Sequence, residues 1–117
     1  MPTVINSDRL LNPLDIRQGL GISQERMSNL LKVSSKTITR WEKGERLPNN
    51  SEALSRLAKL KEITELGLMV YTAVGFQEFL KTPLPVFEGR CAFDLFGLGN
   101  YETVLSAIAA DFEGTGF

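Results

Sequence analysis

The sequence contains no histidine and only one cysteine, Cys91, among its 117 residues. Without histidine it can form neither a Ser-His-Asp triad nor a histidine-ligated metal site, and a single cysteine excludes both an intrachain disulfide and a cysteine-cluster zinc site. The scarcity of cysteine indicates a reducing, cytoplasmic setting. We therefore expect a protein that is not an enzyme and that uses no cofactor and no metal.

Long hydrophobic runs are also missing. The longest stretch without charge, Leu66–Gln77, is too short to cross a bilayer, which takes about 20 residues. No basic start followed by an apolar run and a cleavage site is present, so neither secretion nor membrane contact is expected. The apolar content of 43% supplies a core and excludes intrinsic disorder.

Charge and aromatic residues are unevenly divided along the chain. Residues 1–66 carry 11 Lys and Arg against 8 Asp and Glu, a balance of +3, whereas residues 67–117 carry 2 against 6, a balance of −4. The first part contains Trp41, and the second contains all seven Phe and both Tyr. A basic, polar part suits a polyanion and an acidic part repels one, so we expect two functional halves that divide between Leu66 and Gly67.

Helix signals run through the whole chain, and no segment makes a convincing strand. Capping residues, glycines and helical spacing predict helices over residues 13–19, 24–31, 35–43, 51 to beyond 65, 76–81, 92–96 and 101–112. The segment 66–76 could continue the long helix or begin another. The predicted fold class is all-α, with Trp41, Phe87, Phe93, Phe96 and Phe112 in the core and Cys91 as a small buried group.

The second and third predicted helices have the layout of a helix-turn-helix unit, because both are short and a tight turn separates them. At about 100° per residue, Ser35, Lys36, Thr39, Arg40 and Lys43 fill one arc of the third helix. Ile38 and Trp41 fall on the opposite side. Hydroxyls, amines and a guanidinium on one face are what base edges and phosphates of DNA accept. On pattern alone, an ordinary solvated face is an equally good interpretation.

The segment Arg17–Pro48, RQGLGISQERMSNLLKVSSKTITRWEKGERLP, closely resembles the Xre-type (lambda-repressor-like) helix-turn-helix family. The matching landmarks are Ser23-Gln24, Val33-Ser34, Ile38 and Trp41-Glu42-Lys43-Gly44. The resemblance implies a five-helix module over residues 1–66 that binds double-stranded DNA as a homodimer, with a buried ion pair between Arg17 and Glu42. It also implies DNA contacts, which we assign to Gln24, Ser34, Ser35, Lys36, Thr37, Thr39, Arg40 and Lys43.

The segment 76–96, FQEFLKTPLPVFEGRCAFDLF, together with the last helix, resembles the toxin-binding domain of Xre/MbcA/ParS-type antitoxins. The matching landmarks are Phe79-Leu80, Thr82-Pro83, Pro85, Gly89-Arg90 and Leu95-Phe96. Phe79 stands where tryptophan is commoner in that family, and Ala92 stands where proline usually opens the short helix. The resemblance implies a small helical domain over residues 67–117 for toxin binding or dimerisation.

Together the two resemblances imply the antitoxin of a type II toxin–antitoxin pair. Such a protein would neutralise a RES-domain toxin that consumes NAD, and would repress its own operon by binding the promoter. It would be cytoplasmic and nucleoid-associated. Contacts with the partner are assigned to Phe79, Arg90 and Phe117, although an intrachain contact between Arg90 and Asp94 is an equally open interpretation.

Three other functions stay open at this point. The chain could be a stand-alone Xre-family repressor whose second half only dimerises, and only a co-purifying toxin separates that possibility from an antitoxin. It could be a structural adaptor that has kept the helix-turn-helix shape without binding DNA. An enzyme is the weakest alternative, because no nucleophile–base pair is present.

Overall fold

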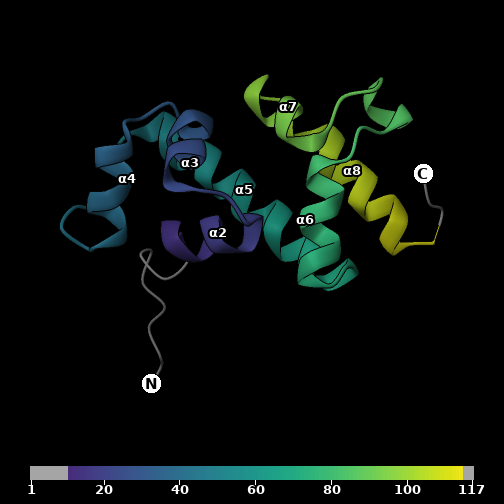
Figure 1. The fold of residues 1–117 in the computed structure, drawn as a ribbon, viewed down its shortest axis with the longest axis horizontal. Helices are drawn as coiled ribbons and strands as arrows, with labels where there is room; N and C mark the ends of the chain where they lie inside the picture. The colour runs from purple at the N-terminus through teal and green to yellow at the C-terminus, as the bar shows by residue number, and fades with distance from the viewer. Residues whose placement is uncertain (1–10, 115–117) are drawn as a thin grey trace. The chain divides into compact units, whose positions relative to one another are not determined.

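A computed structural model describes residues 11–114 of the chain, and in this range every regular element is a helix (Figure 1). The all-α prediction is therefore confirmed. The elements are α2 (Pro13–Leu20), α3 (Gln24–Leu31), α4 (Ser35–Glu42), α5 (Ser51–Val70), α6 (Ala73–Lys81), a 3-10 turn η1 (Pro85–Phe87), α7 (Ala92–Gly97) and α8 (Tyr101–Phe112). None of these helices is both long and apolar enough to cross a membrane.

The chain divides into two compact units, an N-terminal unit up to Lys61 and a C-terminal unit from Glu62. The division falls inside α5, earlier than the expected boundary after Leu66. α5 thus gives its first turns to one core and its last turns to the other. Between Pro13 and Lys61 the N-terminal unit holds α2, α3, α4 and the start of α5.

The helices of the N-terminal unit begin where polar side chains can accept the free N–H groups of a first turn. Asn12 accepts from the N–H of Asp15 at 3.1 Å, and Ser23 accepts from the N–H of Arg26 at 3.1 Å. Pro13 follows Asn12 at the first helical position, where a missing N–H costs nothing. These caps confirm the predicted starts of α2 and α3.

The core of the N-terminal unit is aliphatic. Leu20, Met27, Leu31, Ile38 and Leu57 are at most 1% exposed, so each of the four helices supplies at least one fully buried side chain. α4 packs against both α2 and α3. Burial of each such side chain contributes about 1.5–3 kcal/mol. This packing fixes the inner side of α4 and leaves its other side exposed.

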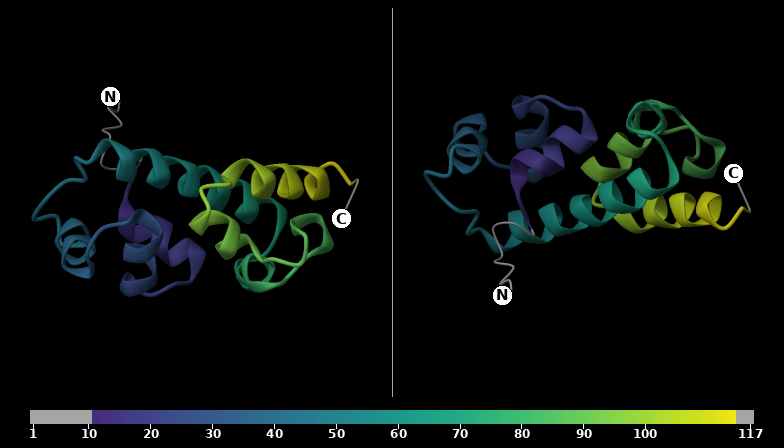
Figure 2. Two further views of the ribbon diagram at one scale, coloured as in Figure 1. Left: turned by 90° about the horizontal axis from the view of Figure 1, so that it is seen from above. Right: turned by 90° about the horizontal axis from the view of Figure 1, so that it is seen from below.

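The core of the C-terminal unit is aromatic. Phe79 stacks on Tyr71 with ring centroids 5.3 Å apart and meets Phe87 edge-on at 6.1 Å. Phe96 stacks on Tyr101 at 5.6 Å. α7 packs against both α6 and α8, and two opposite views show the three helices as neighbours (Figure 2). Such ring pairs add about 0.5–1.5 kcal/mol each to the energy of burial.

Within the C-terminal unit, α6 approaches α5 closely at Gly67. A Cβ placed on Gly67 would lie 2.2 Å from a ring carbon of Phe76, which is itself fully buried. The glycine therefore lets the aromatic ring lie directly on the backbone of α5. The sequence left open whether residues 66–76 continue the long helix or begin another. In the structure α5 continues to Val70, and Thr72 then caps α6 by accepting from the N–H of Gly75 at 3.0 Å.

Two predictions for the core of the C-terminal unit are wrong. Phe112 is 58% exposed, because it is the last residue of α8 and lies one turn past Ile108, the last buried residue of that helix. Cys91 is half-buried and not an apolar core group. Its thiol lies 3.3 Å from the carboxylate of Asp94, and that carboxylate also accepts from the N–H of Cys91 at 3.1 Å, which closes the first turn of α7.

Candidate nucleic-acid interface

The two helices of the predicted helix-turn-helix unit are joined by a turn over residues 32–34, in which Lys32 adopts a left-handed conformation with φ of 61°. Ser34 then caps α4: its hydroxyl accepts from the N–H of Thr37 at 3.0 Å and lies 2.9 Å from the Thr37 hydroxyl. Ile38 and Trp41 are 0% and 6% exposed. The inner side of α4 is thus the one that the sequence predicted.

The opposite side of α4 carries the polar residues that were assigned to DNA. We call it the outer face of α4; it consists of Ser35, Lys36, Thr39, Arg40 and Lys43. Lys36 and Lys43 are exposed and Arg40 is half-buried. Within residues 11–114 these three cations form no ion pair. The outer face therefore presents positive charge that no acid of the described chain neutralises, which is what a phosphate backbone binds.

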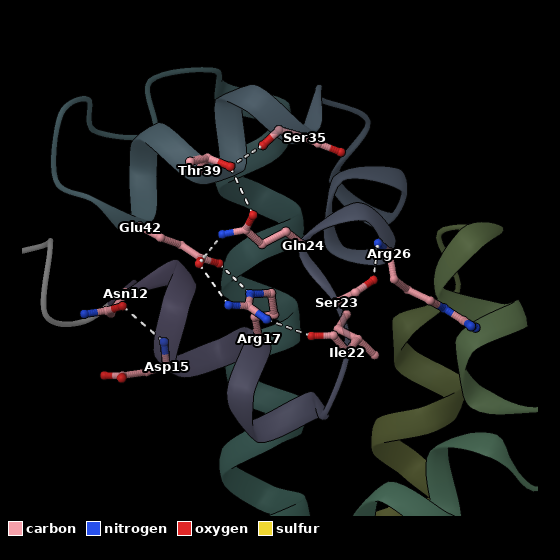
Figure 3. Close-up of polar contacts among 10 residues, drawn as sticks. All are labelled: Asn12, Asp15, Arg17, Ile22, Ser23, Gln24, Arg26, Ser35, Thr39 and Glu42. Atoms are coloured by element: carbon pink, nitrogen blue, oxygen red, sulfur yellow. Dashed lines mark hydrogen bonds and ion pairs between the residues drawn. The ribbon is translucent and has the colours of Figure 1, made fainter.

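The acid of α4, Glu42, does not pair with the cations of the outer face. Glu42, at the last position of α4, forms a two-pronged ion pair with Arg17 of α2 (Figure 3). Nε of Arg17 donates to one carboxylate oxygen at 2.5 Å, and a terminal nitrogen donates to the other at 2.9 Å. The second terminal nitrogen donates to the carbonyl of Ile22 at 3.0 Å. The ion pair that the resemblance implied is confirmed, and it ties α4 to α2.

Gln24, the first residue of α3, extends this network to the outer face. Its amide nitrogen donates to Glu42 at 2.8 Å, and its amide oxygen accepts from the hydroxyl of Thr39 at 3.0 Å (Figure 3). Only this orientation of the amide is possible, because a carboxylate cannot donate a hydrogen bond. Four side chains from three helices, Arg17, Glu42, Gln24 and Thr39, thus form one polar network.

This network reduces the number of hydrogen-bond donors that Gln24 and Thr39 have available for DNA. The hydroxyl proton of Thr39 is shared between Gln24 and the carbonyl of Ser35, also at 3.0 Å. Gln24 keeps one free N–H, because an amide nitrogen carries two hydrogens. Both residues hold α4 in place, and their assigned DNA contacts stay predictions. Within residues 11–114, the side chains of Lys36, Arg40 and Lys43 form no such hydrogen bond.

The electrostatics of the network follow from its hydrogen bonds. Burial alone would raise the pKa of Glu42, but the hydrogen bonds from Arg17 and Gln24 outweigh burial and hold that pKa below its ordinary value. The hydrogen bond with Glu42 raises the pKa of Arg17. Both groups are therefore charged at neutral pH, and the ion pair is intact at that pH.

Sequence reasoning missed one supporting residue. Ser28 of α3 is 4% exposed; its hydroxyl donates to the carbonyl of Glu25 at 2.6 Å and lies 3.4 Å from the hydroxyl of Ser35 at the start of α4. The signal was present, since a serine beside Met27, Leu30 and Leu31 marks a point where two helices approach closely. Its satisfied hydroxyl explains why a polar side chain is tolerated there.

The three residues assigned to a protein partner differ in their placement. Phe79 is 8% exposed and stacks on Tyr71. Burial raises the pKa of Tyr71 far above its ordinary value, and the Asp111 carboxylate adds to the shift. Phe79 thus belongs to the core and has little surface for a partner. Arg90 is exposed and forms no ion pair within residues 11–114. Phe117 lies outside the described residues.

Between residues 11 and 114, no three acidic or cysteine side chains lie close enough together to hold a metal ion. The residues with assigned DNA contacts are hydroxyl, amide and cationic side chains. Their chemistry consists of charge, hydrogen-bond donors and shape.

Comparisons with known proteins agree with this reading of the fold. Residues 14–60, which cover α2 from its second residue, α3, α4 and the start of α5, match the helix-turn-helix family. No curated protein sequence matches the chain. The fold is similar to that of a chain in the crystal structure of the M. tuberculosis MbcT–MbcA toxin–antitoxin complex, with a TM-score of 0.76 over 94% of this chain and 97% of that chain, at 24% sequence identity.

Proposed function

We propose that the protein is a DNA-binding antitoxin. Its N-terminal unit binds the promoter of its own operon, and its C-terminal unit binds and neutralises a cognate toxin. The observation that carries the DNA part is the outer face of α4, where Lys36, Arg40 and Lys43 are unpaired within the described chain. The toxin part is supported by the likeness to a chain from a toxin–antitoxin complex, which extends over both units.

The DNA contacts in this proposal have separate tasks. Arg40 and Lys36 read base edges in the major groove, where Arg and Lys donate to guanine. Ser35 shares the base-reading positions with them, and Thr37 flanks these positions. Lys43 binds the phosphate backbone, and Ser34 lies beside the free N–H groups at the start of α4, which suit phosphate oxygens. Gln24 and Thr39 contact DNA at the edge of the groove while the polar network holds them. A homodimer places two such helices about one turn of DNA apart, ~34 Å or a multiple of it.

The partner in this proposal is a RES-domain toxin that consumes NAD. The C-terminal unit would cover the active-site cleft of the toxin, with Phe117 as a contact at the end of the chain. The acidic balance of residues 67–117, with 2 basic against 6 acidic residues, suits a protein partner and repels DNA. The chain itself carries out no catalysis and works in the cytoplasm, on the nucleoid.

Co-expression tests the proposal. The full chain, tagged at its N-terminus, is produced together with the genes that neighbour its own. We expect one companion at fixed stoichiometry that is toxic when produced without this chain. Deletion of residues 114–117 should weaken neutralisation and leave promoter binding intact.

The competing function is a stand-alone repressor whose C-terminal unit only dimerises. A clean homodimer that binds its promoter and retains no companion would establish that function instead. Loss of promoter binding on deletion of residues 114–117 would contradict the separation of the two tasks.

A further inference from the structure

Thr39 is the residue through which the polar network reaches the outer face of α4. Its side chain is half-buried, and its hydroxyl oxygen lies 3.0 Å from the amide oxygen of Gln24 and 3.0 Å from the carbonyl oxygen of Ser35 (Figure 3). A threonine hydroxyl has one hydrogen to donate and two lone pairs that accept. Both neighbouring oxygens can only accept, so the single hydrogen of Thr39 is directed at them.

Glu42 determines the direction of the hydrogen bond between Thr39 and Gln24. If the amide turned its nitrogen toward Thr39, the hydroxyl would accept and keep its hydrogen for another partner. Glu42 prevents this turn, because its carboxylate accepts from the amide nitrogen of Gln24 at 2.8 Å and has no hydrogen to give. Arg17 keeps Glu42 ionised through the two-pronged ion pair. The ion pair therefore fixes Thr39 as the donor within the network.

The hydroxyls at the start of α4 are not fixed in this way. Ser34 and Thr37 lie 2.9 Å apart, and either hydroxyl can donate to the other. DNA can therefore find a donor or an acceptor at this pair. Thr39 differs, since it has two lone pairs and a methyl group available for DNA but no hydrogen.

The four bases differ in what they offer to such an acceptor. In the major groove adenine has an amino group at N6 and cytosine has one at N4, whereas the polar atoms of guanine and thymine only accept. An acceptor without a hydrogen of its own can bond to the amino group, but against guanine or thymine two acceptors would meet with no hydrogen between them. Lys36 and Arg40 only donate, so they have the opposite preference, for guanine.

We propose that Thr39 reads an amino group in the operator, N6 of adenine or N4 of cytosine, and rejects guanine and thymine at the same position. Its oxygen accepts from the amino group while its hydrogen stays with Gln24 and Ser35. Gln24 and Glu42 act here as positioning residues, because they set the direction in which Thr39 donates. The inference rests on the proposed DNA binding and adds one element of its sequence preference.

The first test selects operators from a library of random duplexes with the full chain and two variants. Thr39→Val keeps the shape of the side chain and removes the acceptor, whereas Thr39→Ser keeps the hydroxyl and removes the methyl group. We expect the wild type and Thr39→Ser to enrich adenine or cytosine at one shared position. In Thr39→Val this enrichment should fall about threefold to tenfold, the effect of one hydrogen bond, while the rest of the selected sequence stays the same.

The second test removes the amino group from the DNA instead of the acceptor from the protein. Purine replaces the selected adenine, or pyrimidin-2-one replaces the selected cytosine, and binding is measured by fluorescence anisotropy. The analogue weakens base pairing equally for every protein, so the difference between two proteins is the measure. The wild type should lose about threefold to tenfold more affinity than Thr39→Val does. Equal losses in both proteins would mean that another residue contacts the amino group, and the proposal would be overturned.

Gln24→Met tests the positioning role and leaves Thr39 intact. Methionine has a similar length but no amide oxygen, so the hydroxyl of Thr39 is held by Ser35 alone and can turn to donate to DNA. We expect the discrimination against guanine and thymine to fall at the position that Thr39→Val also alters. If Gln24 had only a structural role, the variant would weaken binding to all duplexes alike and leave this preference unchanged.

The outcomes separate this inference from the proposed function. If the wild type enriches no sequence, the proposed DNA binding fails and this inference fails with it. If the wild type enriches a sequence that Thr39→Val selects equally well, or if guanine or thymine stands at the position that Thr39→Val alters, DNA binding stands and the inference is overturned. Should Thr39→Val not fold, an unchanged base preference in Gln24→Met overturns the inference on its own.

Discussion

The two units hold their helices together in different ways. In the N-terminal unit, α2, α3 and α4 are joined across an aliphatic core by the network of Arg17, Glu42, Gln24 and Thr39. In the C-terminal unit, α6, α7 and α8 are joined by stacked and edge-on aromatic rings. Directional bonds fix the orientation of a helix whose outer face must carry unpaired charge. Aromatic packing needs no such bonds, and it leaves an acidic and partly apolar surface.

The largest effect is expected on breaking the polar network. Glu42→Ala leaves Arg17 without its partner, and the side chains are only 7% and 19% exposed. A fully buried pair broken in this way costs about 3–5 kcal/mol, and partial exposure reduces the expected loss in the free energy of unfolding to about 2–3 kcal/mol. Urea denaturation measures it. Glu45→Ala is the control, because it removes an exposed acid only three residues after Glu42. It should change the free energy of unfolding by less than about 0.5 kcal/mol.

The same pair has a pH signature. Since the pKa of Glu42 lies below its ordinary value of 4.5, its contribution to stability is fully present above that value and is lost as the pH falls through the lowered pKa. The difference in unfolding free energy between wild type and Glu42→Ala should therefore be constant near neutral pH and shrink in acid. A difference that stays constant into strong acid would contradict the ion pair as its cause.

The next effect concerns the outer face of α4. Arg40→Ala should cost about 1–3 kcal/mol of affinity for the operator and relax base preference, whereas Lys43→Ala should weaken all duplexes alike. Fluorescence anisotropy with operator and scrambled duplexes separates the two outcomes. Unchanged operator affinity in Arg40→Ala would show that another surface reads the DNA.

In the C-terminal unit, the test is whether added side-chain volume disturbs the packing of α6 on α5. Gly67→Ala places a Cβ against the ring of Phe76. Overpacking costs about 1–3 kcal/mol, and the better helix propensity of Ala returns about 0.5–1 kcal/mol, so we expect a net loss of about 1–2 kcal/mol. Gly97→Ala is the control, because its Cβ would meet nothing within 4 Å. Thermal unfolding of the two variants side by side shows whether close approach, and not glycine as such, matters.

The smallest effect is expected at the link between the network and the outer face. Thr39→Val keeps the volume of the side chain but removes the hydroxyl that Gln24 accepts from. One neutral hydrogen bond contributes about 0.5–1.5 kcal/mol to stability. The cost should disappear in a Gln24→Ala background, since both substitutions break the same bond. Additive losses in the double variant would mean that Thr39 acts independently of Gln24.

The sequence predicted the parts of the molecule that local chemistry decides. Ser23 and Ser34 determine where α3 and α4 begin, because each can accept a first-turn N–H, and both starts are confirmed. Ile38 and Trp41 are buried as helical spacing predicts. What the sequence could not give are relations across the fold. The bond from Thr39 to Gln24 joins residues 15 positions apart, and it shows that two residues with expected DNA contacts also belong to a supporting network.

The C-terminal unit was predicted less well, for a related reason. Aromatic residues carry no directional signal, so spacing alone did not show that Phe79 is buried while Phe112 is exposed. The sequence left open whether residues 66–76 continue the long helix or begin another; in the structure α5 continues to Val70, and Gly67 lets the ring of Phe76 pack against it.

The central claim, that the two units carry separable tasks, is tested most directly by one variant in two assays. Lys36→Ala combined with Arg40→Ala removes two unpaired cations from the outer face of α4 without touching the C-terminal unit. We expect this chain to lose specific binding to its promoter in a fluorescence anisotropy titration and to protect cells from the co-expressed toxin as well as the wild type does. Promoter binding at wild-type affinity would contradict the account, because the outer face of α4 would then not be the surface that binds DNA.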